Sequence, residues 1–165
     1  IGVENGAVQT AAQRIGSTQG INDPFSAHAI SDRPITALGE AFQHDRVIDR
    51  QRGLPFVTAA RFKRDATLLD IAPDGPGRWP TQVGGNYALA TAEHAVTQRW
   101  ANRISEAYLC GLHYTGLYGG GACIALFLPA ANAIPDRTAF SRSLTDPALQ
   151  DRLGTAAERL GYDLV

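Results

Sequence analysis

The segment from Ala29 to Gln43, AISDRPITALGEAFQ, contains the side chain best placed for chemistry, the carboxylate of Glu40. Ile35, Leu38 and Phe42 recur at three- and four-residue spacing, which is the apolar stripe of an amphipathic helix. Glu40 borders that stripe instead of facing open water. A carboxylate at such a border usually has a partner or a function, because burying an unpaired charge is costly. Two interpretations therefore stay open: Glu40 pairs with an arginine at the rim, or it serves a site.

Two further patterns could carry chemistry. The glycine run 119–121 lies between two apolar segments, and glycines allow a backbone to approach a phosphate or a ribose closely. No lysine–serine pair follows it, and a strand is expected where a phosphate-binding loop would lead into a helix, so a long hairpin connection is the simpler interpretation. Cys110, His113 and Cys123 lack a paired CxxC motif and a fourth ligand, so no metal is expected.

Length and composition narrow the class of protein. The 165 residues are enough for one domain over 1–165 that buries about two-thirds of its unfolded surface. A net charge of -1 does not suggest nucleic-acid binding, which needs a basic stripe. No apolar run approaches the roughly 20 residues that span a bilayer, and residues 1–13 lack the pattern of a secretory signal. Two cysteines do not make a disulfide framework. We expect a cytoplasmic protein with free thiols that binds neither membrane nor nucleic acid.

The remaining patterns predict the elements that position Glu40. Pro34 suits the first turn of a helix, and Gly161 after Leu160 is typical of a helix end. The other elements are predicted from short segments rich in apolar residues that are bounded by turn-forming residues. They predict strands at 26–30, 55–62, 67–71, 107–114, 122–128 and 162–165, and helices at 34–45, at 87–104 and from 145–147 to Gly161. Because this order lacks regular βαβ spacing, we expect a mixed α+β fold.

The order of these motifs resembles the RES domain family from about Arg14 to Val165. The resemblance rests on ISDRPITALGEAFQ, a strand pair ending LLDI, a loop containing WP, an alanine-rich helix with W-x-x-x-I, and GLHYTG–GGG–ACIALF. The family takes its name from an arginine, a glutamate and a serine. Its members are typically toxins of bacterial toxin–antitoxin pairs, with a fold related to ADP-ribosyltransferases. They consume NAD by phosphorolysis or hydrolysis, or they transfer ADP-ribose to a protein. The resemblance therefore implies an ADP-ribosyltransferase-like mixed sheet, NAD as substrate, and a cognate antitoxin as partner.

Compared with the family's polar residues, this chain matches unevenly. Glu40 falls on the family's glutamate, which implies a catalytic role, and Arg14 looks like the arginine of the first strand. The family's tyrosine falls on Ala29. Its serine falls near Thr115 and Gly116, and Thr115 offers a hydroxyl one position away.

A second arginine of the family should fall near residues 19–22, where none stands; Arg33 or Arg61 could substitute. In NAD cleavage, a carboxylate stabilises the positive charge that develops on the ribose, and arginines hold the diphosphate. Losing one preorganised donor costs ~2.7–4 kcal/mol in the barrier. Three hypotheses follow: an NAD-consuming toxin weakened at these positions, a catalytically degenerate RES-like binding domain, or an unrelated α/β domain.

Overall fold

The computed structural model describes residues 2–3, 8–13, 30–72, 96–97, 99–100, 104 and 110–165. Arg14, Ala29 and most of the predicted 87–104 helix lie outside these residues. The five described residues of that predicted helix are helical.

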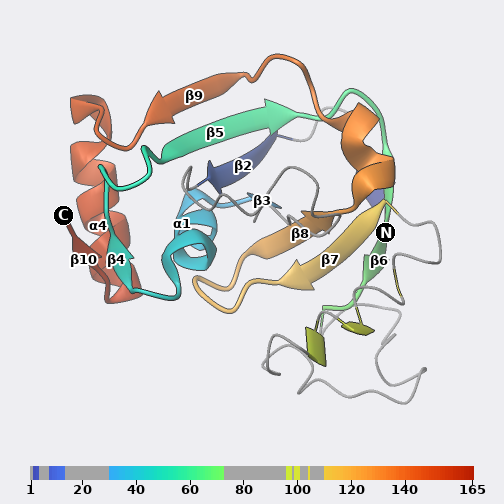
Figure 1. The fold of residues 1–165 in the computed structure, drawn as a ribbon, viewed down its shortest axis with the longest axis horizontal. Helices are drawn as coiled ribbons and strands as arrows, with labels where there is room; N and C mark the ends of the chain where they lie inside the picture. The colour runs from blue at the N-terminus through green and yellow to red at the C-terminus, as the bar shows by residue number, and fades with distance from the viewer. Residues whose placement is uncertain are drawn as a thin grey trace.

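An eight-stranded sheet forms the centre of the fold, in the order β1-β6-β7-β8-β3-β2-β5-β9 (Figure 1). Neighbouring strands are antiparallel except for β6 and β7, which are parallel. The strands are β1 Gly2–Val3, β2 Val8–Gln13, β3 Ile30–Ser31, β5 Phe56–Arg61, β6 Ala66–Asp70, β7 Gly111–Thr115, β8 Ala122–Leu126 and β9 Phe140–Ser143.

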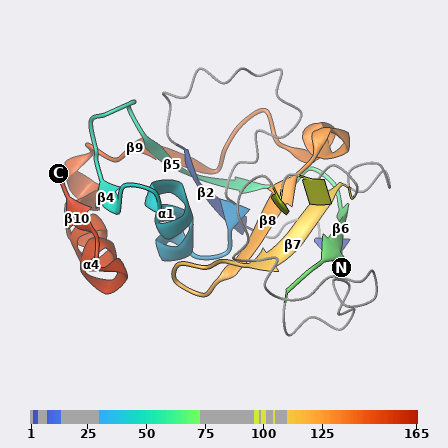
Figure 2. The same ribbon diagram turned by 60° about the horizontal axis from the view of Figure 1, so that its bottom comes forward.

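Two α-helices lie at one end of the sheet. Helix α1, Pro34–Phe42, follows β3. Helix α4, Gln150–Leu160, lies farther from the sheet than α1 in both views (Figures 1 and 2). Beside α4, β4 Val47–Ile48 pairs in parallel with β10 Asp163–Leu164. The 3-10 helix η2, Leu128–Ala133, follows β8, and η3, Pro147–Leu149, leads into α4. The expected mixed α+β fold is therefore confirmed. Among the described residues, no helix has the length and apolar character that crossing a membrane requires.

The sequence predicted α1, α4, β10 and the strands β5 to β8 but misjudged some ends, and it did not predict β1, β2, β4 or β9. Residues 26–29 of the strand predicted at 26–30 lie outside the described residues. The first helix stops at Phe42 instead of residue 45, because the chain turns at 43–46 with Arg46 at a positive φ of 52°. The strand expected over 122–128 ends at Leu126, since the 3-10 helix begins at Leu128 with Pro129 in its first turn. Strands β5 and β6 follow one another in sequence but do not pair, because β5 lies between β2 and β9. The C-terminal helix ends at Gly161, in the left-handed region at φ 68°.

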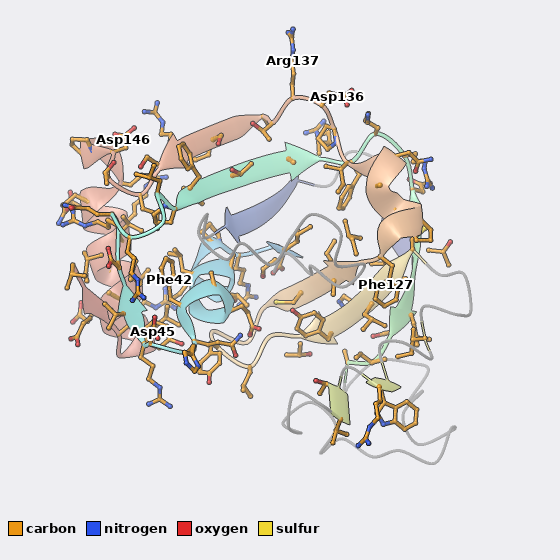
Figure 3. All side chains as sticks on the ribbon, viewed as in Figure 1. Phe42, Asp45, Phe127, Asp136, Arg137 and Asp146 are labelled. Atoms are coloured by element: carbon orange, nitrogen blue, oxygen red, sulfur yellow. The ribbon has the colours of Figure 1, made fainter. Side chains whose placement is uncertain are left out.

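The hydrophobic core has two parts. One cluster joins α1, β4 and α4 around Phe42 and Ile48, both at most 1% exposed. The other gathers Phe62, Leu68 and Ile124. Figure 3 shows Phe42 near β4, while Phe127 lies beside η2 at the other end of the molecule. The first cluster fixes α1, and with it Glu40, against β4 and α4.

Candidate functional site

Glu40 is half-buried on α1, and its carboxylate contacts the loop of residues 116–121 that joins β7 to β8. Helix α1 and this loop lie side by side in the ribbon (Figures 1 and 2). The backbone N–H of Tyr118 donates a hydrogen bond to Glu40 Oε1 at 3.3 Å, and the N–H of Leu117 also donates to the carboxylate. Within the described part of the chain, Glu40 forms no salt bridge with an arginine. Among the residues that the structure describes, backbone amides and not a rim arginine therefore hold this carboxylate.

Two opposing effects act on the charge of Glu40. Burial raises the pKa of its carboxyl above the ordinary value of 4.5, and the two backbone donors lower it by a smaller amount. Water is partly excluded around the group, so its interaction with a nearby positive charge is stronger than in bulk solvent. Glu40 thus has the surroundings expected of a group that stabilises a cation.

The glycine run belongs to a hairpin connection, as the simpler interpretation held. Strands β7 and β8 pair from Gly111 to Thr115, and the N–H of Gly116 donates to the carbonyl of Gly121 at 2.9 Å. Gly119 and Gly120 have φ of 83° and 62°, a region that other residues rarely adopt. The glycines therefore serve the turn itself.

Gly116, one of the residues near which the resemblance places the family's serine, has no room for a side chain. A Cβ at Gly116 would lie 2.6 Å from Thr36 Cγ2, 2.8 Å from Cys123 Sγ and 3.2 Å from Glu40 Oε1. The neighbouring hydroxyl, on Thr115, is exposed. Thr36 and Cys123 thus occupy the space beside Glu40 that a serine would need.

Three polar side chains form a row beside Glu40, a grouping that the sequence patterns did not predict. Ser31, Cys123 and Tyr114 stand opposite one another on β3, β8 and β7, so they share one face of the sheet. Cys123 hydrogen-bonds with both Ser31 and Tyr114. The hairpin around the glycines would have placed Tyr114 against Cys123, but their closeness to Glu40 depends on how α1 packs.

Burial raises the pKa values of the two acidic groups in this row, Cys123 and Tyr114. It raises the pKa of the Cys123 thiol to about 11, and the negative charges of Glu40 and Asp32 contribute in the same direction. It also raises the pKa of the Tyr114 phenol, with smaller contributions from Cys123 and Glu40. Both groups therefore stay protonated near neutral pH. A thiol held in this way is a poor nucleophile, so Cys123 is a packing and hydrogen-bonding group.

The three residues weighed as metal ligands are not brought together. His113 pairs in register with Ile124, next to Cys123, so His113 and Cys123 face opposite sides of the sheet. His113 Nδ1 instead lies 2.9 Å from Oδ1 of the buried Asp70. The described residues contain no group of three or more histidine, cysteine, aspartate or glutamate side chains able to hold a metal ion. Cys110 and Cys123 are both free thiols, as the sequence predicts.

Arg33 lies at a cavity of about 520 Å³ between α1, the loop and the end of α4. Arg159, which lies far from Arg33 in sequence, also lines it, so only the folded chain reveals this pair of guanidinium groups. Glu40 is not among the described lining residues, which are Arg33, Ile35, Leu117, Tyr118, Gly119, Arg159 and Leu160. Arg61, the other candidate substitute, is the exposed last residue of β5. The cavity and Glu40 thus share the loop residues Leu117 and Tyr118.

Comparison with known proteins gives one match. The model of the RES domain family matches residues 30–147, which is more than half of the chain. The match begins just after Ala29 and includes Glu40, Arg33, Thr115 and Gly116. Neither the curated proteins nor the solved structures contain a match. On the strength of the family match, this chain belongs to the RES domain family, a family of NAD-consuming toxins.

Proposed function

We propose that this chain cleaves the bond between nicotinamide and ribose in NAD, with Glu40 as the catalytic carboxylate. Its membership of a family of NAD-consuming toxins supports the choice of substrate. The observation that carries the residue assignment is the half-buried Glu40 carboxylate, fixed by the backbone N–H groups of Leu117 and Tyr118.

The chemistry requires a fixed negative charge beside the ribose. When the C1′–N bond breaks, its electron pair leaves with nicotinamide and positive charge develops on the ribose. An ionised carboxylate that is already oriented stabilises this charge without reorganising. The acceptor, which is phosphate, water or a protein nucleophile, then forms the new bond to C1′ and gives up a proton. Glu40 needs no metal for this role.

The remaining site residues are proposed as substrate-binding groups. Arg33 projects from the start of α1 at the cavity, where a guanidinium fork suits a diphosphate. The resemblance assigns Arg14 a similar role and places Ala29 opposite the ribose. It also implies substrate-binding positions at Thr115 and Gly116, and the glycine run 119–121 would shape the wall of the pocket. An antitoxin partner and a cytoplasmic location are proposed from the family alone.

A second candidate function is a RES-like domain that binds a nucleotide or a partner without turnover. The crowding at Gly116 favours it, because Thr36 and Cys123 fill the space of the family's serine. Ala29 favours it as well, since the expected tyrosine is missing. Restoring that ring would add ~0.5–1.5 kcal/mol of aromatic contact, so Ala29→Tyr is expected to raise a weak activity.

The experiment is loss of NAD measured by chromatography, with the products identified. We expect the parent to exceed buffer, and Glu40→Gln to reduce the rate by about 10²–10³-fold. Glu158→Gln, which makes the same change at an exposed position of α4, is the matched control and should equal the parent. Free ADP-ribose, its 1-phosphate or modified protein would identify the acceptor.

Two outcomes would contradict the proposal. Equal rates for Glu40→Gln and the parent would remove Glu40 from catalysis. Rates equal to buffer for the parent and for Ala29→Tyr would leave the binding domain as the function.

A further inference from the structure

Thr36 has no place in the chemistry proposed above, yet it lies one helical turn before Glu40. Residues four apart on a helix share a face, so Thr36 and Glu40 present their side chains to the same neighbour. That neighbour is the 116–121 loop. Thr36 is a polar residue with 0% exposure, which calls for a partner for its hydroxyl.

The hydroxyl of Thr36 meets the end of the loop. The backbone N–H of Gly121 donates to Thr36 Oγ1 at 3.2 Å, in a buried hydrogen bond. The loop backbone also packs tightly here: a Cβ on Gly119 would lie 2.9 Å from Thr36 Oγ1, and one on Gly121 would lie 2.6 Å from it. The absence of side chains at both positions therefore allows the loop to reach Thr36.

Glu40 meets the same loop near its middle, through the N–H of Tyr118 at 3.3 Å. The two ends of the loop are also joined to each other, since the N–H of Gly116 donates to the Gly121 carbonyl at 2.9 Å. Helix α1 thus ties the loop at two points one turn apart.

We propose that Thr36 is a positioning residue, whose hydroxyl holds the 116–121 loop so that its backbone N–H groups meet the Glu40 carboxylate. The catalytic importance of this arrangement rests on the function proposed above, but the arrangement itself can be measured without NAD. Thr36 does not touch the reacting atoms; it acts through the loop.

Removing the Thr36 hydroxyl leaves a buried hydrogen-bond donor, the Gly121 N–H, without its acceptor. Without Oγ1, the Gly121 N–H is buried with no partner in the described structure, and the loop moves to hydrate it. Tyr118 and Leu117 then retract from Glu40. Because these N–H groups lower the pKa of Glu40, their loss raises it further. A carboxylate displaced by about 1 Å loses up to about 10²-fold in rate.

The test compares Thr36→Ala with Thr36→Ser, two variants that both lack the Thr36 methyl group and differ only in the hydroxyl. Carbon-13 NMR follows the titration of the Glu40 carboxyl, with Glu40→Gln to assign the signal. Amide hydrogen exchange follows Tyr118 and Gly121. Turnover of NAD is measured on the same samples.

We expect Thr36→Ser to keep the parent's Glu40 titration, amide protection and turnover. We expect Thr36→Ala to raise the pKa of Glu40, to speed exchange at Tyr118 and Gly121, and to lower kcat by about 10- to 100-fold with little change in KM. If the two variants share one Glu40 titration and one exchange pattern, the proposal is wrong. If the parent does not cleave NAD, the proposed function fails, while titration and exchange still decide the role of Thr36.

Discussion

Replacing Gly116 with serine tests the packing beside Glu40 directly. The new Cβ would lie 2.6 Å from Thr36 Cγ2 and 2.8 Å from Cys123 Sγ, distances that well-packed atoms do not tolerate. Both neighbours are completely buried, so neither can move into solvent. Forcing extra atoms into such a core costs about 1–3 kcal/mol. For a chain of this length, each kcal/mol lowers Tm by about 2–4 °C.

The assay is thermal and urea unfolding of Gly116→Ser against a control with the same substitution. Gly154 lies within α4, and a Cβ there meets nothing within 4 Å. Gly154→Ser should therefore leave Tm unchanged or raise it slightly, because glycine is a poor helix former. Gly116→Ser should lower Tm at constant m.

A double-mutant cycle identifies the cause. Thr36→Ser and Cys123→Ala remove Cγ2 and Sγ, the two atoms that a side chain at position 116 would meet. Each costs stability in the parent, but with serine at 116 the cost should shrink by about 0.5–3 kcal/mol, the usual coupling of contacting residues. A Gly116→Ser protein that melts with the parent, or a cycle without coupling, would refute the reasoning.

Three other perturbations have definite expected outcomes. Burial raises the pKa of Glu40 in the folded state above its ordinary value of 4.5, so the parent loses stability as pH rises from that value through the folded-state pKa. The stability of Glu40→Gln relative to the parent should therefore grow as pH rises above 4.5, and a difference independent of pH would contradict this. In the folded protein, Cys123 should react with iodoacetamide far more slowly than the partly exposed Cys110, because Cys123 is buried and its pKa is raised to about 11. In denaturant the two thiols should react at similar rates. Similar rates in the folded state would argue against a buried thiol. Gly161→Ala should lower the free energy of unfolding in urea by roughly 1–2 kcal/mol, because φ is 68° there. A methyl group at this position meets no neighbour, so backbone strain alone would cause the loss. An unchanged urea midpoint would count against a left-handed helix end.

The sequence predicted the start of α1, the end of α4 and the hairpin turn well, because these depend on residues close together in the chain. Pro34 marked the start of α1, and Gly161 marked the end of α4 through its need for a positive φ. The glycine run was correctly interpreted as a hairpin connection. The border position of Glu40 on its helix correctly indicated a carboxylate that is neither fully buried nor free in solvent.

What the sequence by itself determined was the helix that carries Glu40, the hairpin that faces it and the mixed α+β class. Only the tertiary structure decided that Thr36, Gly116 and Cys123 share one crowded space, that Arg159 joins Arg33 at a cavity, and that β5 and β6 separate. The physical reason is the range of the interactions. Turn geometry and helical periodicity are set by neighbours along the chain, whereas strand order and side-chain crowding are set by packing between segments that the sequence places far apart.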